Sequence, residues 1–247
     1  MSEDLIAAAR EYAVRMMERL ALIVPTGDIG LECEAVKRSD GLRMTIATAV
    51  QGGLVLTIDG DPRLQLEVDQ YLFVSPDSGN VATERSSFLV RVVDEPRPMF
   101  TLDYVRGARA NTPAAHYNFH FEHDEVVQEL LLAGSRRRGK LHKKNAMKGK
   151  SPKLGDLHFP VGGHRFRPCL EDVLELLWSE FGIDVRSETA QDAISAGRAE
   201  WRQFQLKAAV ADDPMSAIEE LERLGFTGSW SEGVVPRTAR IDRVTAM

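Results

Sequence analysis

Seven short apolar segments, separated by turn-forming residues, occupy the chain between residues 31 and 122 and limit what it can fold into. They are rich in Val, Ile, Leu, Thr and Phe, and sequences such as Ser-Asp-Gly at 39–41 and Asp-Gly-Asp-Pro at 59–62 lie between them. Short runs joined by tight turns are typical of antiparallel strands. The sequence therefore predicts a curved antiparallel meander with strands over 31–37, 42–50, 53–59, 64–74, 86–94, 98–105 and 115–122.

Helical periodicity flanks this region on both sides. Residues 3–23 carry apolar side chains at helical spacing, with Ser2 as the N-cap and acidic Glu3 and Asp4 in the first turn. The tail at 234–244 alternates weakly, which is typical of an edge strand. The further helices that the sequence predicts cover 124–133, 170–181, 188–210 and 214–224.

These elements predict an α+β fold, with an N-terminal helix packed on the curved antiparallel sheet and a helical part after it. A chain of 247 residues is long enough for one large domain or for a domain with a smaller annex. We expect an α+β domain over 1–183, including a basic loop at 135–156, and a helical subdomain over 184–247 that ends in the tail.

Composition favours a cytoplasmic protein without a membrane segment. No apolar run approaches the ~20 residues that span a bilayer, and the first residues carry acids where a signal peptide carries positive charge. The two cysteines, Cys33 and Cys169, are too few for a disulfide framework, which fits a reducing compartment.

Positive charge is concentrated in one run. The chain has a net charge of −6, yet residues 136–153 hold nine Lys or Arg and no acid, so the remainder carries −15. Three interpretations stay open: a solvated surface loop, an arm that contacts nucleic-acid phosphates, or a strip that docks an acidic protein partner. The candidate phosphate-binding residues in this run are Arg136, Arg137, Arg138, Lys140, Lys143 and Lys144.

Residues 116–122 (His-Tyr-Asn-Phe-His-Phe-Glu) form the most informative predicted strand. Because side chains alternate across a strand, His116, Asn118 and His120 share one face and the aromatic residues share the other. With the aromatic face in the core, a column of titratable groups lies on a rigid surface, which suits acid–base chemistry near neutral pH. We expect Asp103, on the preceding strand, to orient one histidine. The alternative is an ordinary solvated sheet face.

A second set of candidates precedes the helix expected from residue 170. Gly162 and Gly163 allow backbone amides to approach an anion closely. Arg165 and Arg167 alternate with Phe166, so both guanidinium groups are expected to point the same way, and such groups match phosphate geometry. A simple turn with solvent-facing arginines is the alternative.

Neither a metal nor a cofactor is expected. The spacing of His116, His120 and His123 resembles that of metal ligands, but on a strand His116 and His120 lie about 13 Å apart, and His123 falls on the other face.

These features predict a protein that acts on nucleic acid, in the first place RNA. His116, His120, His158 and His164 are its candidate acid–base groups, in a metal-independent ribonuclease mechanism. Arg165, Arg167 and the basic run would hold phosphates. Two alternatives stay open: a non-catalytic subunit that docks a partner, and a sheet that encloses a small ligand. The sequence indicates no oligomeric state.

The order of these features resembles the TumE-type toxin components of bacterial toxin–antitoxin systems. The resemblance rests on Leu-Asp-Tyr at 102–104, His116, His-Phe-Pro at 158–160 and Glu-Asp-Val-Leu at 171–174. It implies an RNA-directed or translation-inhibiting activity restrained by a partner, in a toxin–antitoxin or antiviral defence system. The chain departs from the family in lacking adjacent paired histidines, in its basic insertion and in its greater length.

Overall fold

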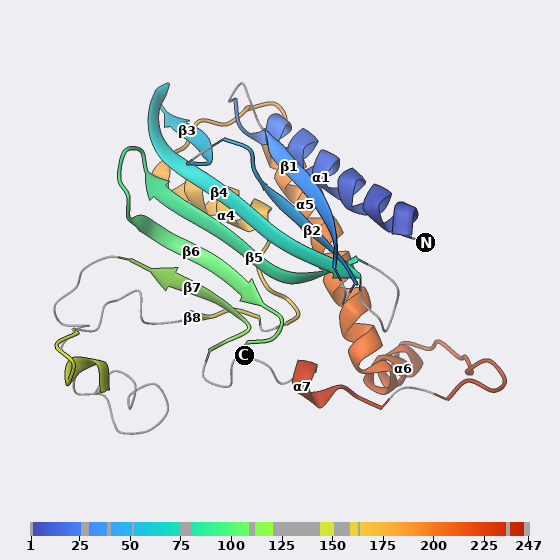
Figure 1. The fold of residues 1–247 in the computed structure, drawn as a ribbon. Coiled ribbons are helices and arrows are strands. Elements are labelled where there is room, and N and C mark those ends of the chain that lie inside the picture. Colours follow the sequence, from blue (N-terminus) through green and yellow to red (C-terminus); the bar gives the residue numbers. More distant parts are fainter. Residues whose placement is uncertain are drawn as a thin grey trace.

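The computed structural model describes residues 2–25, 30–38, 41–50, 52–74, 81–108, 112–120, 144–150, 159–162, 164–235 and 238–244. An open, antiparallel sheet of eight strands lies at the centre, and helices cover one of its faces (Figure 1). The predicted α+β class, with an N-terminal helix on an antiparallel sheet and helices after it, is confirmed.

The sheet follows the predicted meander, with one strand paired off its main path. In space the order is β1-β2-β4-β5-β6-β7-β8, and β3 also pairs with β4. The long β4 makes this possible, because its first half pairs with β3 and its second half with β2 along the same edge. The strands are β1 (Leu31–Arg38), β2 (Gly41–Thr48), β3 (Leu54–Ile58), β4 (Asp61–Val74), β5 (Val81–Val92), β6 (Pro98–Val105), β7 (Ala115–Phe119) and β8 (Phe159–Pro160).

Strand alternation divides the sheet into an apolar and a polar face. On β4, Leu64, Leu66 and Val68 are buried while the residues between them are partly exposed. The buried face packs against α1 (Ser2–Ile23), α4 (Leu170–Leu176) and α5 (Ala190–Asp212) to form one core. Consequently the side chains that alternate with the core residues lie on the face away from the helices.

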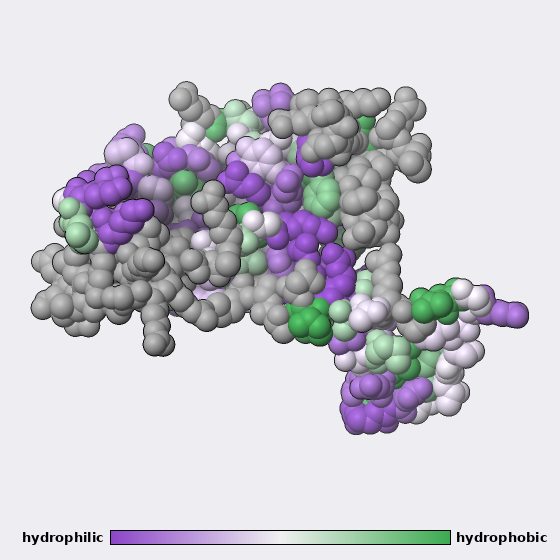
Figure 2. Space-filling model, turned by 60° about the horizontal axis from the view of Figure 1, so that its bottom comes forward, coloured by the Kyte–Doolittle hydropathy of each residue, from purple (hydrophilic) through white to green (hydrophobic). Residues whose placement is uncertain are grey.

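The C-terminal helices continue past the sheet. After α4 the chain widens into a π-helical turn, η2 (Leu177–Phe181), and α5 then crosses the sheet and extends beyond it to α6 (Pro214–Arg223) and α7 (Ile241–Val244) (Figure 1). The helices predicted over 3–23, 170–181, 188–210 and 214–224 are thereby confirmed. The projecting part carries apolar residues on its surface (Figure 2), among them Leu224, Phe226, Trp230 and Val235.

The tail departs from the sequence-based expectation. Instead of an edge strand over 234–244, the described residues 238–244 end in α7, which packs near the end of α5. The backbone N–H of Arg240 donates to the carbonyl of Asp212 at 2.8 Å, so this contact replaces pairing with the sheet. The alternating tail is short, and Pro236 lacks a backbone donor for a strand ladder.

Several predicted segments lie partly or wholly outside the described residues. These are the helix at 124–133 and most of the basic loop at 135–156. Within that loop, residues 144–146 form one helical turn where an irregular segment was expected. The division at residues 183 and 184 stays a prediction.

None of the helices in the described part of the chain is both long enough and apolar enough to cross a membrane.

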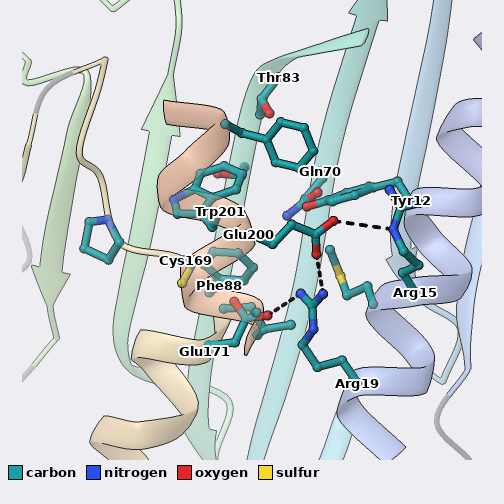
Figure 3. Close-up of a pocket in the computed structure, with 16 residues that line it drawn as sticks. Tyr12, Arg15, Arg19, Gln70, Thr83, Phe88, Cys169, Glu171, Glu200 and Trp201 are labelled. Atoms are coloured by element: carbon teal, nitrogen blue, oxygen red, sulfur yellow. Dashed lines mark hydrogen bonds and ion pairs between the residues drawn. The ribbon is translucent and has the colours of Figure 1, made fainter. Parts of the chain in front are cut away.

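A partly buried ion-pair network ties α1 to α4 and α5. Arg19 Nη1 lies 2.8 Å from Glu171 Oε1, and Arg19 Nη2 pairs with Glu200 (Figure 3). The cavity beside it, between α1, the sheet and α5, has a volume of about 30 Å³, which is room for one or two water molecules rather than for a metabolite. Gly197 lets α5 approach this network closely.

We predict that Gly197→Ala destabilises the fold. The new Cβ would lie 2.2 Å from Glu171 Oε1 and 2.6 Å from Arg19 Cδ. Overpacking of this kind costs about 1–3 kcal/mol, more than the ~1 kcal/mol that alanine gains over glycine in a helix. Urea unfolding measures the difference, and Gly107→Ala is the matched control because its Cβ would meet nothing within 4 Å. A Gly197→Ala variant as stable as the wild type would contradict the packing described.

Asp184 fastens the β3–β4 turn to the segment before α5. Its carboxylate accepts hydrogen bonds from the backbone N–H groups of Asp59 at 3.1 Å and Gly60 at 2.8 Å. A hydrogen bond from the Thr57 side chain, together with these amides, lowers the pKa of Asp184.

We predict a pH-dependent effect of Asp184→Asn. Because the folded-state pKa lies below the unfolded value of about 3.9, the stabilisation is present above that value and is lost as pH falls through the folded-state pKa. Thermal unfolding should therefore show a lower Tm for Asp184→Asn at pH 7 and a shrinking difference as the pH drops below about 4. A difference that stays constant down to pH 3 would count against the ionised carboxylate as its source.

Candidate functional site

β6 and β7 place two predicted site histidines on opposite faces of the sheet. Asp103 lies directly opposite His116, and the next pair is Tyr104 with Ala115. Because neighbouring residues point to opposite faces, His116 lies on the face away from the helices and Tyr104 on the helix face. His164 contacts Tyr104, with its Nδ1 3.2 Å from the hydroxyl oxygen. His116 and His164 therefore do not meet at one site.

The polar face of the sheet centres on Asp103. Three side chains donate hydrogen bonds to its carboxylate: Ser87 at 2.7 Å, Thr101 at 2.7 Å and Asn118 at 2.9 Å. His116, across the strand pair, is buried, and its Nδ1 lies 2.9 Å from the carbonyl oxygen of Pro113. Asp103 thus neighbours His116 in the strand register, within a network that holds its carboxylate in place, and the expected orienting of a histidine by Asp103 stays a prediction.

The other predicted residues lie apart from this network or outside the described part of the chain. His120 is half-buried at the end of β7, and strand spacing puts it about 13 Å from His116. His158, Arg136, Arg137, Arg138, Lys140 and Lys143 lie outside the described residues, and Lys144 is exposed. The acid–base role of the histidines and the phosphate-binding role of the basic run stay predictions.

Five arginines converge at the end of β6, and we call them the arginine cluster: Arg106, Arg165, Arg167, Arg240 and Arg243. Arg106 follows β6, two come from the turn before α4, and two come from the tail around α7. The continuation of α5 brings these segments together, because Asp212 at its end contacts both the turn and the tail.

Arg167 is the buried centre of the cluster. Its guanidinium lies between two aromatic rings, 3.8 Å from the centroid of Tyr104 and 4.8 Å from that of Trp201. Its Nη1 donates to the carbonyl oxygen of His164 at 2.8 Å and to Gln205 Oε1 at 3.2 Å. Burial lowers the pKa of Arg167 to about 10, so it remains charged at neutral pH. Cation–π stacking and hydrogen bonds compensate the desolvation of this charge.

Arg165 and Arg240 share a buried carboxylate. Arg165 Nη2 lies 2.8 Å from Asp212 Oδ2, and Arg240 Nη1 lies 4.0 Å from Asp212 Oδ1. Asp212 is only 3% exposed, so the pair with Arg165 holds the turn against the end of α5. The side chain of Arg165 remains partly open to solvent.

The arginines create a positive field that acts on one another and on His164. Burial, and then Arg243, Arg165, Arg167 and Arg106, lower the pKa of His164 to about 4. His164 is therefore neutral at pH 7. Burial and neighbouring arginines also lower the pKa of Arg106. A group of cations that disfavour one another's charge is a place where an anion is bound favourably.

A strained turn presents an aromatic ring beside the cluster. Phe166 has a left-handed backbone (φ +60°), which is unusual for a residue other than glycine. Its large apolar side chain is also 69% exposed. Gly162, at φ +68°, makes the turn possible, because a Cβ there would lie 2.4 Å from the carbonyl oxygen of Phe166. The glycine thus serves close packing within the turn.

A cavity of about 290 Å³ opens next to this ring. Phe166 and Val210 form apolar parts of its wall, and Arg165 and Arg243 from the cluster also line it. Its size lies just below the range for small-molecule sites, which begins at about 300 Å³. Asp212 and Asp213 line it as well, so the cavity joins apolar surface to side chains of both charges.

Sequence reasoning found Arg165 and Arg167 but missed the rest of the cluster. Arg106 is far along the chain from Arg240 and Arg243, and none of the three belongs to a motif. The three-residue spacing of Arg240 and Arg243 does match one face of a helical turn. Both predicted arginines do belong to one cluster. Their guanidinium groups are held differently, since the left-handed backbone at Phe166 breaks strand alternation.

Among the described residues, no group of three or more His, Cys, Asp or Glu is arranged to hold a metal ion.

Comparisons with protein-family models, with curated proteins and with solved structures gave no match to this chain.

Proposed function

We propose that this chain binds nucleic acid, in the first place RNA, through phosphates held at the arginine cluster. The observation that carries the proposal is the convergence of five arginines from three separate segments around neutral His164. Asp212 pairs with Arg165 and Arg240 and offsets part of the repulsion among these like charges, and a bound phosphate would relieve it further. Arginine suits this ligand because its planar fork matches phosphate oxygens.

Two neutral side chains beside the cluster suit a polar ligand that carries negative charge, although Asp212 and Asp213 also line the cavity. Neutral His164 and the hydroxyl of Tyr104 offer hydrogen-bonding groups without adding negative charge. Arg165 and Arg243 reach the cavity, while buried Arg167 contributes through its field. An extended ligand such as an RNA strand has several phosphates. Those that do not bind at the cluster would contact the basic run at 136–153.

Binding is the part of the predicted function that this geometry supports. A ribonuclease of the predicted type needs one histidine as base and another as acid around the phosphate. His164 is the histidine at the cluster, and as a neutral ring at pH 7 it carries no proton to donate as an imidazolium acid. Hydrolysis, and the toxin component suggested by the resemblance, stay predictions.

A partner-binding subunit is the second candidate function. The observation in its favour is the exposed apolar surface of the projecting C-terminal part (Figure 2). Leu224, Phe226 and Val235 are 66%, 58% and 86% exposed. Exposed large apolar side chains gathered on one part of a protein are typical of sites that bind other proteins.

We also propose a reducing, cytoplasmic location. Both cysteines are free, and Cys169 is buried at the start of α4, where burial raises the pKa of its thiol.

The RNA-binding proposal predicts a loss of affinity when the cluster is neutralised. Arg243→Gln and Arg106→Gln should each weaken the binding of a short oligouridylate about 5- to 10-fold at low salt, and reduce the slope of log K against log salt by about 1. Fluorescence anisotropy over a salt series measures both quantities.

Arg63→Gln is the matched control, because Arg63 is exposed near the other end of β4. A separate variant with Arg136, Arg137, Arg138, Lys143 and Lys144 changed to Gln measures the share of the basic run. Equal affinities and slopes for wild type, Arg243→Gln and Arg106→Gln would refute binding at the cluster.

A further inference from the structure

We propose that β1 is a dimerisation strand, which pairs antiparallel with β1 of a second copy of this chain. The two sheets join into one continuous sheet across a two-fold axis at Ala35. None of the residues involved belongs to the arginine cluster, so this inference does not depend on the proposed binding of RNA.

β1 is a long open edge of the sheet. Its eight residues pair with β2 on one side, and no other strand in the described part of the chain pairs with it on the outer side (Figure 1). The opposite edge is formed by β8, which has only two residues, one of them Pro160. Short strands, prolines and bulges are usual means of protecting a sheet edge. β1 contains no proline, and its register with β2 is regular, so its outer edge is suited to pairing with a further strand.

The order of charges along β1 selects the partner. Glu32 and Glu34 lie in its first half and Lys37 and Arg38 in its last, and both glutamates are exposed. Charges on an edge strand deter pairing with strands in general, because like charges opposite each other destabilise a sheet. A strand with the reverse order of charges is the exception. β1 of a second copy, running antiparallel, presents this reverse order.

The inner neighbour of β1 does not supply the opposite charges. Glu32 and Glu34 lie opposite Ala47 and Thr45 on β2. Arg43, the cation of β2, lies 3.4 Å from the carboxylate of Glu84 on β5, on the side away from β1. A positive charge directly across from either glutamate therefore has to come from a strand on the outer side.

An axis at Ala35 gives the register that matches best. Residues opposite each other in an antiparallel ladder have the same backbone orientation, so the axis passes through a residue and not between two. With Ala35 on the axis, residues 32–38 pair, and Glu32 lies opposite Arg38 of the second copy. An axis at Glu34 would place two glutamates directly opposite each other. An axis at Val36 would shorten the ladder to residues 34–38.

α1 adds apolar surface beside this edge. The backbone N–H of Leu31 donates to Met17 Sδ at 3.4 Å. Burial raises the pKa of the Cys33 thiol and the charge of Arg10 lowers it, so Arg10 also lies near β1. Val14 is on the same face of α1, four residues from Arg10 and three from Met17, and it is 44% exposed. In the dimer both α1 helices lie on the same side of the joined sheet, which brings Val14 near the joint.

Charge-reversal variants test the pairing between copies. Glu32→Arg and Arg38→Glu should each weaken the dimer about 10-fold or more, because each replaces two attractive pairs by two repulsive ones. An equimolar mixture of the two variants should restore wild-type affinity, since every opposite pair in the mixed dimer again joins a positive and a negative side chain. Sedimentation equilibrium over a concentration series at low salt measures these affinities, and circular dichroism verifies that each variant is folded. Glu95→Arg is the matched control, because Glu95 is exposed between β5 and β6.

A disulfide at the axis tests the register. Ala35→Cys, made together with Cys33→Ser, places two thiols opposite each other with Cα atoms about 4.5–5.5 Å apart, within the range of a disulfide. Mild oxidation should then give a covalent dimer on a non-reducing gel. Glu32→Cys in the same background should give none, because its two copies lie about 20 Å apart along the ladder. Cys169 is buried and does not compete.

Two results would overturn the inference. A wild-type protein that stays monomeric at the highest concentration, with no cross-link through Ala35→Cys, would show that a second copy does not occupy the edge. A dimer that neither charge reversal weakens would place the interface elsewhere, for example on the apolar surface of the C-terminal part. RNA binding is measured separately, so neither result bears on the proposed function.

Discussion

α1, α4 and α5 cover one face of the sheet with apolar side chains, and the positions of the other elements follow from this packing. α5 needs only its first half to cover the sheet, with Ala193 and Ile194 in the core. Its second half extends past the strands, where Trp201 and Asp212 meet the turn before α4 and the tail. The long helix thereby assembles a site from segments that the sheet alone would leave apart.

The arginine cluster is stabilised by interactions that offset the repulsion between like charges at close range. Stacking between Tyr104 and Trp201 keeps Arg167 charged while it is buried, and Asp212 pairs with Arg165. Burial, and then the positive field of the arginines, lower the pKa of His164 and suppress its protonation. Such an arrangement costs stability in the free protein, and the anion that we propose as its ligand would offset part of this cost.

The sequence predicted local features well, because they depend on alternation and periodicity. The two faces of β7 and the helices at 170–181 and 188–210 follow from neighbouring residues alone. The cluster could not be predicted in this way, since Arg106 and Arg243 are brought together by tertiary packing. The weak alternation of the tail predicted a strand, but contact with the end of α5 gives a helix there. Along the sequence, positive charge is concentrated in the run at 136–153. In space, the arginine cluster is a second concentration of positive charge, which the sequence alone does not reveal.

The central claim is tested most directly by measuring the pKa of His164. NMR of the ring protons of His164 gives this pKa in the free protein and in the presence of saturating oligouridylate. The His164→Gln variant assigns the signal. In the free protein the pKa should be about 4, because burial and the arginines disfavour the imidazolium. Bound phosphate offsets the field of the arginines, so the pKa should rise by about one unit or more. A free-protein pKa near 6.5, or a low value that RNA does not change, would contradict an anion site at the arginine cluster.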